Sequence, residues 1–343
     1  MNGSGQTVRE IGEFGLISAL AGALPAEVTA GPGLELGIGD DCAVWTPAPG
    51  EKIVVTTDSL VQDIHFRLEW TDWERLGHKT LAVNLSDLAS MGAIPRLAVI
   101  TLALRGDERV DDLRALYQGL GALAQRTGTL VAGGDIVRSP DSLAFHVTAI
   151  GETRGGRVIP RSGARPGDLV AVSGTLGASA AGLALMLEAG SERAGAATAD
   201  LLRDAHLRPE PRIALGGALL AHGASAAMDL SDGLFGDLPK ILSASGVSAR
   251  IDAARLPVAA AVRALFPDHW LELASRGGED YELLFTIASG RWNALSEAAE
   301  ALGNPVTAIG EILPRDGDRP ELLLADVNGR VKRIESGAFD HFD

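Results

Sequence analysis

The feature that most constrains this chain is an apolar strand that runs directly into hydroxyls and a carboxylate. Residues 53–55 (Ile-Val-Val) are typical of a buried strand, and Thr56, Thr57 and Asp58 follow at once. We expect the end of this strand to carry Asp58 into a crevice, where α/β sheets tend to bind ligands. A carboxylate in so apolar a run is costly unless something compensates its charge. An Asp that only caps a turn or a helix is the open alternative.

Carboxylates recur beside glycine or serine in two more places where an apolar run ends. A short strand predicted over residues 129–132 leads into a glycine turn, 133–135, where the backbone can approach a ligand and Asp135 can coordinate a metal. The apolar run 226–228 ends at Asp229, and Ser231 or Asp232 would N-cap the helix that follows. The alternatives are a plain turn with a solvated Asp135, and capping alone at Ser231 or Asp232.

Two further carboxylates belong to the same pattern. Asp41 follows Asp40 in a glycine-rich turn, where a buried pair would need protons or a cation, although an exposed loop would leave both unremarkable. Asn84 and Asp87 are spaced i, i+3 on a helix predicted over residues 81–92, and so share one face. Because neighbouring residues of that helix are apolar, we expect it to be buried against the site.

Convergence of these carboxylates would require divalent cations to offset the negative charge. Oxygen ligands without a cluster of Cys or His favour Mg²⁺ or Mn²⁺ over Zn²⁺. The chain has neither a Gly-x-x-x-x-Gly-Lys-Ser/Thr loop nor a His-Arg-Asp kinase signature. The residues alone therefore predict a Mg²⁺-dependent enzyme that handles phosphates, and they leave its substrate open.

Composition sets the outer limits. A chain of 343 residues has room for roughly two domains, and we place the boundary in the polar, glycine-rich stretch 151–157, which gives domains 1–150 and 151–343. The formal charge of −15 argues against nucleic-acid and anionic-membrane partners. A single cysteine, Cys42, fits a reducing compartment, and the sequence has neither signal-peptide features nor a membrane-spanning run. We expect a soluble, cytoplasmic protein.

An ordered set of motifs over nearly the whole chain resembles thiamine-monophosphate kinase, within a superfamily that includes aminoimidazole ribonucleotide synthetase. Each motif is weak alone, but the ordered set is specific. The motifs are Gly-Ile-Gly-Asp-Asp-Cys-Ala (37–43), Thr-Thr-Asp-Ser-Leu-Val (56–61), His-Phe (65–66), Lys-Thr-Leu-Ala-Val-Asn-Leu-Ser-Asp-Leu-Ala (79–89), Gly-Gly-Asp (133–135), Met-Asp-Leu-Ser-Asp-Gly-Leu (228–234), Gly-Gly-Glu-Asp-Tyr-Glu-Leu (277–283) and Phe-Asp-His-Phe (339–342).

The resemblance implies a two-domain α/β (α+β) fold of the synthetase type. Its N-terminal mixed sheet would pair across a homodimer, and its C-terminal domain would be an α/β sandwich that completes the active site. It also implies direct, in-line, Mg²⁺-assisted transfer of the γ-phosphoryl group of ATP to thiamine monophosphate, giving thiamine diphosphate and ADP. Such a transfer needs no protein nucleophile.

The resemblance also assigns roles to individual residues. The Mg²⁺ ligands would be Asp41, Thr56, Thr57, Asp58, Asp87, Asp135, Asp229 and Asp232. The ATP contacts would be Tyr117, Gly134, Asp135, Arg161 and Ser231. The contacts to the thiamine substrate would be His65, Glu279 and Phe339, with Phe339 offering an aromatic face to a cationic ring.

Two positions depart from the family pattern. Ile136 stands where Thr often follows Gly-Gly-Asp, and Asp63 stands near His65 where Gly is common. Two other functions remain as alternatives: another ATP-dependent synthetase of the same superfamily, which would turn over ATP without thiamine monophosphate, and a non-catalytic Mg²⁺-nucleotide-binding protein.

Overall fold

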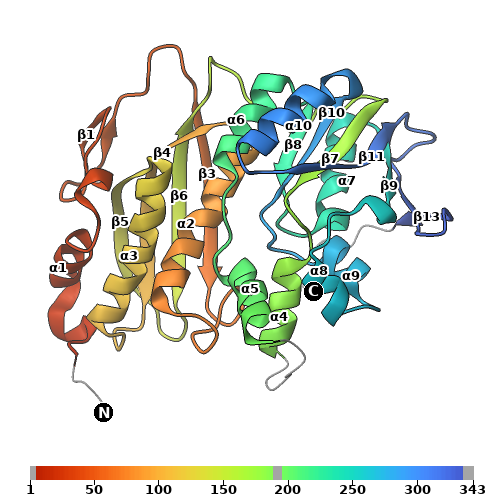
Figure 1. The fold of residues 1–343 in the computed structure, drawn as a ribbon. Helices are drawn as coiled ribbons and strands as arrows, with labels where there is room; N and C mark the ends of the chain where they lie inside the picture. Colours follow the sequence, from red (N-terminus) through yellow and green to blue (C-terminus); the bar gives the residue numbers. More distant parts are fainter. Residues whose placement is uncertain (1–4, 188–194, 335–343) are drawn as a thin grey trace. The chain divides into compact units, whose positions relative to one another are not determined.

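The chain forms two compact units, each with its own β-sheet, in a computed structural model that describes residues 5–187 and 195–334 (Figure 1). Unit 1 comprises residues 1–88 and 94–156, and unit 2 comprises residues 89–93 and 157–343. Both sheets are mixed and both carry helices, so the predicted α/β (α+β) class is confirmed. No helix of the described residues is long and apolar enough to span a membrane.

Unit 1 is built on a four-stranded sheet with the order β3-β6-β4-β5. β4 pairs in parallel with β5 and antiparallel with β6, and β6 pairs antiparallel with β3. A separate antiparallel pair, β1-β2, precedes it. The elements are α1 (Val8–Ala21), β1 (Leu34–Leu36), β2 (Val44–Trp45), β3 (Ile53–Val61), α2 (Trp73–Ser90), β4 (Ile94–Leu104), α3 (Val110–Thr127), β5 (Leu130–Arg138) and β6 (Ala144–Glu152).

One face of this sheet is covered by α2 and α3, and the other is largely open. Alternate residues of β4 and β6, such as Leu102 and Phe145, are fully buried, as the period-two pattern of a half-covered sheet requires. The two helices cross in close contact, because a Cβ at Gly77 would lie 1.8 Å from the carbonyl oxygen of Leu116. On the opposite face, Ile53 and Val55 of β3 are 54% and 60% exposed.

Two local predictions for unit 1 are wrong. The strand that starts at Ile53 does not end at Asp58 but continues to Val61, so Asp58 lies within β3. The glycine turn predicted at 133–135 is likewise part of a strand, β5. In both places a neighbouring strand supplies the backbone hydrogen bonds.

Unit 2 is built on a seven-stranded sheet with the order β13-β12-β9-β11-β7-β10-β8. All neighbouring strands pair antiparallel except β12 and β9, which are parallel. The strands are β7 (Asp168–Ser173), β8 (Ala226–Asp229), β9 (Ser248–Asp252), β10 (Leu283–Ala288), β11 (Val306–Leu313), β12 (Leu322–Ala325) and β13 (Val331–Ile334).

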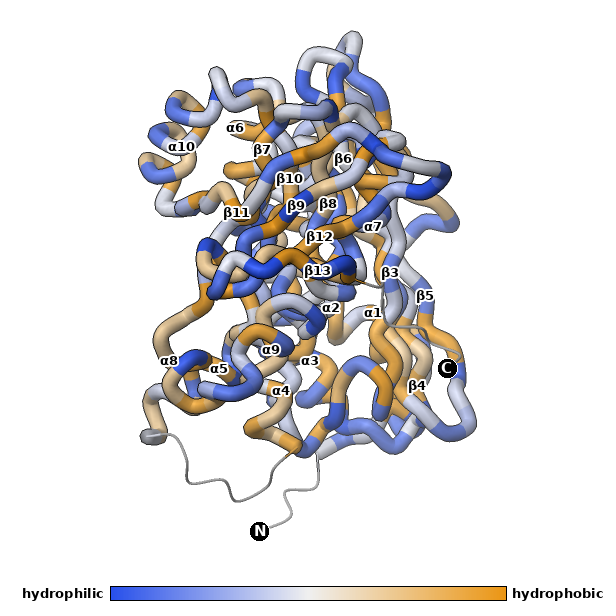
Figure 2. Tube along the Cα trace, turned by 90° about the vertical axis from the view of Figure 1, so that its right-hand side faces the viewer, coloured by the Kyte–Doolittle hydropathy of each residue, from blue (hydrophilic) through white to orange (hydrophobic). Residues whose placement is uncertain are grey.

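Apolar cores on both faces of this sheet give unit 2 the layered α/β build that was predicted. Met228 and Leu284 pack with Leu238 of α7 on one face. Phe285 packs with Leu215 of α6 and Leu295 of α10 on the other. Hydrophobic residues concentrate in these strands and in the helices that cover them (Figure 2). The helices are α4 (Ala178–Leu187), α5 (Ala196–Leu207), α6 (Ile213–His222), α7 (Leu234–Ser245), α8 (Ala260–Leu265), α9 (Trp270–Arg276) and α10 (Trp292–Ala301).

Candidate functional site

Unit 1 brings three of the predicted metal ligands together between β3 and α2. The hydroxyl of Thr56 donates a hydrogen bond to Oδ2 of Asp87 at 2.5 Å. Loss of hydration, the negative charge of Asp87 and a hydrogen bond between the two carboxyls together raise the pKa of Asp58 to about 7. A bound cation would offset the negative charge that the two carboxyls bring together.

Thr57 takes the opposite side of the strand. Its hydroxyl donates to the carbonyl oxygen of Val147 at 2.9 Å and accepts a hydrogen bond from Thr148 at 3.3 Å. Since successive side chains of a strand alternate between faces, the Thr57 hydroxyl points away from the Thr56–Asp87 contact. The structure therefore does not bring Thr57 into the carboxylate cluster through its side chain.

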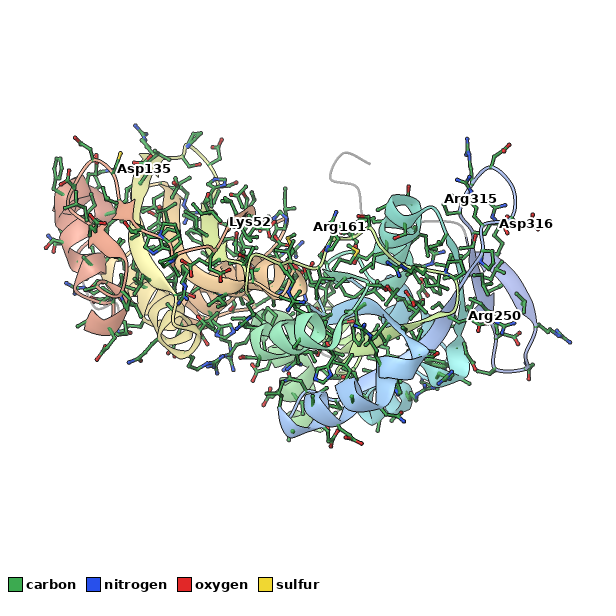
Figure 3. The ribbon with its side chains drawn as sticks, turned by 90° about the horizontal axis from the view of Figure 1, so that it is seen from above. Lys52, Asp135, Arg161, Arg250, Arg315 and Asp316 are labelled. Carbon is green, nitrogen blue, oxygen red and sulfur yellow. The ribbon has the colours of Figure 1, made fainter. Side chains whose placement is uncertain are left out.

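The Gly-Gly-Asp segment lies on β5, an edge strand of the unit 1 sheet, where Asp135 is exposed (Figure 3). Its Oδ1 accepts a hydrogen bond from the backbone N–H of Ile136 at 2.8 Å. A Cβ at Gly134 would lie 1.9 Å from the carbonyl oxygen of Ile100, so only glycine fits against β4 there. Asp41 is exposed in the loop before β2, as in the open alternative of the sequence analysis.

A tight turn after β3 positions His65. Asp63 adopts a positive φ of 66°, and its N–H donates to the carbonyl oxygen of Phe66 at 2.8 Å. Asp is among the residues that tolerate this conformation best, which explains how it can stand where glycine is common. Nδ1 of His65 accepts a hydrogen bond from the N–H of Val61 at 3.1 Å, which holds the imidazole against the end of the strand.

In unit 2, Asp229 ends β8, and the loop between β8 and α7 carries Ser231 and Asp232. Asp229 is buried, and it stands where the predicted apolar run ends. Neither Ser231 nor Asp232 caps α7, because the N-cap residue is Gly233. The capping interpretation is therefore wrong. Instead, the backbone N–H groups of Ser231 and Asp232 both donate to Oδ2 of Asp237, at 3.0 and 2.9 Å.

A lysine that the sequence analysis did not single out completes this loop. Nζ of Lys240 donates to Oδ2 of Asp232 at 2.6 Å and to Oδ1 of Asp237 at 2.8 Å. Both pairs are ion pairs, and the Asp237 side chain is fully buried. The pKa of Asp237 is raised by burial, against the opposing effect of Lys240.

The Gly-Gly-Glu-Asp motif packs directly on this loop. The N–H of Glu279 donates to the carbonyl oxygen of Ser231 at 2.9 Å. A Cβ at Gly278 would lie 2.6 Å from that same oxygen, so glycine permits the close approach. Pairing of β8 with β10, with Leu283 opposite Asp229, brings the two motifs together. Ser231, Asp232 and Glu279 thus form one cluster within unit 2.

Buried contacts fix the Glu279 segment on both sides. Oδ2 of Asp280 accepts a hydrogen bond from the N–H of Gly177 at 2.7 Å, just before α4, and burial raises the pKa of this carboxyl to about 7. Glu282 forms a two-pronged ion pair with Arg212, with the closest N–O distance 2.5 Å. Oε2 of Glu279 itself lies 3.2 Å from Nδ1 of His206.

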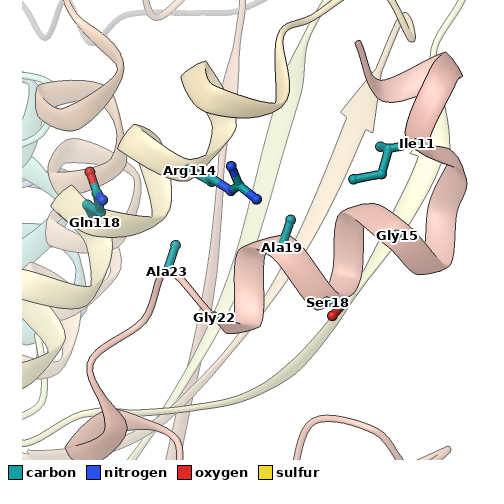
Figure 4. Close-up of a pocket in the computed structure, with 8 residues that line it drawn as sticks. All are labelled: Ile11, Gly15, Ser18, Ala19, Gly22, Ala23, Arg114 and Gln118. Carbon is teal, nitrogen blue, oxygen red and sulfur yellow. The ribbon is translucent and has the colours of Figure 1, made fainter. Parts of the chain in front are cut away.

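The other predicted site residues are dispersed. Tyr117 lies in the core on α3, with 8% of its surface exposed, and burial raises its pKa. Arg161 is exposed on unit 2 (Figure 3). Phe339 and the terminal Phe-Asp-His-Phe motif lie outside the described residues. A pocket of about 450 Å³ between α1 and α3, lined by Ile11, Gly15, Ser18, Ala19, Gly22, Ala23, Arg114 and Gln118, contains none of the predicted residues (Figure 4).

Small groups of these carboxylates, each with one or two members, could hold Mg²⁺. Among residues 5–187 and 195–334, no group of three His, Cys, Asp or Glu side chains could hold a metal ion. Mg²⁺ is commonly held by one or two carboxylates, with water and substrate phosphates filling the remaining positions. The pair Asp58 and Asp87, with the hydroxyl of Thr56, is such a set, because the two carboxyls interact directly and the hydroxyl bonds one of them.

Comparisons with known proteins agree with this geometry. Residues 39–153 match the N-terminal domain of AIR synthase related proteins, and residues 165–322 match their C-terminal domain. The fold and the paired carboxylates thus define an AIR synthase related protein with both of its domains.

Relatives within that class narrow the assignment. The thiamine-monophosphate kinase of Bacillus subtilis is 37% identical over 310 residues, which cover 90% of this chain and 94% of the relative. The crystal structure of thiamine-monophosphate kinase from Stenotrophomonas maltophilia is 41% identical, with a TM-score of 0.81, covering 89% of this chain and 95% of that one. A structure described as AaThiL complexed with AMPPCP and TMP is 33% identical, with a TM-score of 0.75, covering 99% and 100%. The chain belongs to the thiamine-monophosphate kinase family.

Several residues of the cluster were missed by sequence reasoning. Asp237 and Lys240 carried a local signal, because they are opposite charges at i, i+3 on a mostly apolar helix. His206 carried none, since only the fold brings it to Glu279.

Proposed function

We propose that this chain transfers the γ-phosphoryl group of ATP to the phosphate of thiamine monophosphate, giving thiamine diphosphate and ADP. The chain belongs to the thiamine-monophosphate kinase family, and residues of the family's motifs lie together in each unit; this combination carries the proposal. The groups are Thr56, Asp58 and Asp87 in unit 1, and Ser231, Asp232 and Glu279 in unit 2. A related structure that carries both AMPPCP, a nucleotide analogue, and TMP supports the same pair of substrates.

Mg²⁺ would supply the charge neutralisation that phosphoryl transfer requires. We assign its ligands to Asp41, Thr56, Thr57, Asp58, Asp87, Asp135, Asp229 and Asp232. The side chains of Asp58 and Asp87 carry this assignment furthest, because the two carboxyls already lie together between β3 and α2. Thr57 faces the other side of β3 and would need to contribute through its backbone carbonyl.

The chain's own residues would position the two substrates. We assign ATP contacts to Gly134, Asp135, Arg161, Ser231 and Tyr117. Gly134 and Ser231 offer backbone at close approach, and Arg161 offers an exposed guanidinium that suits phosphate. Tyr117 is nearly buried, so it could offer a nucleotide only the small part of its surface that stays exposed.

We assign thiamine monophosphate contacts to His65, Glu279 and Phe339. Glu279 is half-buried and hydrogen-bonded into place, so its carboxylate can meet a cationic ring without a change of backbone. In-line transfer then needs only positioning, because the acceptor phosphate is itself the nucleophile.

We further propose that the protein is a cytoplasmic homodimer. The open face of the unit 1 sheet carries Ile53, Val55 and Val137 as exposed apolar side chains. The pairing registers place all three on one face, which a second copy of the same sheet would cover. The single free cysteine, Cys42, is exposed, which suits a reducing compartment.

A product assay tests the reaction. Purified protein is incubated with ATP, Mg²⁺ and thiamine monophosphate, and thiamine diphosphate and ADP are separated by chromatography. We expect both products in equal amounts, only when Mg²⁺ is present. ADP without thiamine diphosphate would mean another ATP-dependent synthetase, and binding of Mg²⁺-ATP without either product would mean a non-catalytic binding protein.

A further inference from the structure

A lysine occupies one oxygen of a carboxylate to which the proposed function assigns a metal. Lys240 lies on α7, one helical turn after Asp237, and its Nζ bridges Asp237 and Asp232. Its side chain keeps 35% of its surface exposed, so the ammonium sits at the surface of the loop and not in the core. The ammonium group of Lys240 thus already lies beside the carboxylate of Asp232, where the proposed function places a metal ion.

The bridge is built from two sides. Fully buried Asp237 holds the loop backbone through the N–H groups of Ser231 and Asp232, and it holds the ammonium with its other oxygen. The ammonium group of Lys240 also donates to Oδ2 of Asp232, so Oδ1 of Asp232 is the oxygen that could bind another ligand. Two carboxylates and one ammonium leave the group with a net charge of −1, where the carboxylates alone would carry −2.

We propose that Lys240 weakens the binding of a free divalent cation at Asp232. This inference rests on the proposed function only in taking Asp232 as a metal ligand. A cation bound to Oδ1 would lie about 5 Å from Nζ, given Mg²⁺–oxygen distances near 2.1 Å. At that separation, repulsion between a dication and an ammonium in water-like surroundings lowers affinity roughly tenfold. A site weakened in this way retains a metal best when nucleotide phosphates add their own negative charge.

A metal titration of the full-length protein tests the proposal without turnover. Mn²⁺ is the probe, and its free concentration is followed by electron paramagnetic resonance, with Mg²⁺ competition as a second readout. We expect Lys240→Met to bind Mn²⁺ about five- to tenfold more tightly than the wild type. Lys240→Arg keeps the charge and the bridge, and should stay within about twofold. An unchanged or weaker affinity in Lys240→Met would overturn the proposal.

A double-mutant cycle assigns the effect to Asp232. In an Asp232→Asn background, the Lys240→Met change should give no gain in affinity. A gain that persists there would place the effect elsewhere and overturn the proposal, as would wild-type and Lys240→Met proteins that show no Mn²⁺ binding dependent on Asp232. A protein that shows the predicted affinities but makes no thiamine diphosphate would refute the proposed function alone.

Folding of the variant is checked separately. Lys240→Met leaves Asp237 buried without its ammonium partner, which destabilises the loop. If circular dichroism shows that this variant is unfolded, the pair Asp237→Asn with Lys240→Met replaces it, because the amide oxygen of Asn can still accept the loop hydrogen bonds without a buried charge. That pair is compared with Asp237→Asn alone, from which it differs only by the loss of the ammonium, and the same five- to tenfold gain over that single variant is expected. Its absence would overturn the proposal.

Discussion

The hydroxyl of Thr56 on β3 donates to the carboxylate of Asp87 on α2 at 2.5 Å. This contact ties the strand to the helix, and the carboxyl of Asp58 on the same strand also interacts with Asp87. Two carboxyls held this closely repel each other when both are ionised, and a bound cation would offset that repulsion. The arrangement of Thr56, Asp58 and Asp87 would therefore favour the binding of a cation.

Asp58→Asn should keep the fold and remove most of the activity. Asn is nearly isosteric and relieves the repulsion from Asp87, so the melting temperature should be unchanged or higher. The value of kcat should fall at least about a hundredfold, as is typical when one group that offsets transition-state charge is lost. Steady-state kinetics and thermal melting measure both. Asp141→Asn, at an exposed loop position, is the matched control, and near-normal turnover in Asp58→Asn would make Asp58 a structural residue.

Gly278→Ala should disturb the loop on which Glu279 rests. The added Cβ would lie 2.6 Å from the carbonyl oxygen of Ser231. Because this oxygen belongs to the backbone, the clash can be relieved only by a backbone shift, which costs free energy. We expect a loss of about 1–3 kcal/mol in the free energy of unfolding, together with reduced activity. Denaturant unfolding and the product assay give the two values. Gly290→Ala, where a Cβ would meet nothing within 4 Å, should behave as the wild type. Equal stability of the two variants would show that the backbone at Ser231 can shift to accommodate the added methyl group without loss of stability.

His206 should act on substrate binding through Glu279. Its Nδ1 lies 3.2 Å from Oε2 of Glu279 and 3.0 Å from the hydroxyl of Ser179, and its side chain is buried. Loss of this contact in His206→Ala should raise KM for thiamine monophosphate roughly tenfold, with KM for ATP and kcat within about twofold. His206→Asn can place an amide near the position of Nδ1 and should recover part of the affinity. A rise in KM for both substrates would indicate a structural role only.

Val55→Asp should separate the proposed dimer without unfolding the subunit. Val55 is largely exposed on the open face of the unit 1 sheet, so the single chain tolerates a charge there. Two copies that bury this face would each bury an unpaired carboxylate, which should raise the dimer dissociation constant at least about a hundredfold. Light scattering after size-exclusion chromatography measures the mass. Val327→Asp, equally exposed in unit 2, should leave the mass unchanged. A dimer that survives Val55→Asp would place the interface elsewhere.

Local sequence signals predicted where apolar strands begin but not where they end. Residues 53–55 identified β3, yet Thr56, Thr57 and Ser59 read as a polar break, although Thr suits a strand and β6 supplies their partners. Gly134 read as a turn residue, whereas its lack of a side chain serves close approach to β4. Pairing partners lie far away in the sequence, so no local pattern contains them.

The candidate site was predictable where its residues belong to ordered motifs, and not where they support them from a distance. Asp58, Asp87 and Glu279 were identified from the motifs. His206, by contrast, lies in a helix with no motif of its own, and only packing brings it to Glu279. The capping role expected for Asp232 failed because Asp237 binds the loop N–H groups from inside α7, a contact that follows from the turn geometry and not from residue type.

The buried carboxyl of Asp280 should make stability fall as pH rises. Burial raises its folded-state pKa to about 7, whereas its ordinary value is 3.8. Between these values the unfolded chain has lost the proton that the folded chain keeps, so the unfolded state binds fewer protons and the free energy of unfolding decreases from about pH 4 to pH 7. Asp280→Asn cannot ionise, and it should lose one of the hydrogen bonds from the N–H groups of Gly177 and Ser179. We therefore expect the variant to be less stable than the wild type at pH 5, by about 1 kcal/mol, and to close or reverse that gap by pH 8. Denaturant unfolding of both proteins at pH 5, 6, 7 and 8 measures the difference, and parallel curves would mean that Asp280 ionises in the folded protein at its ordinary pKa.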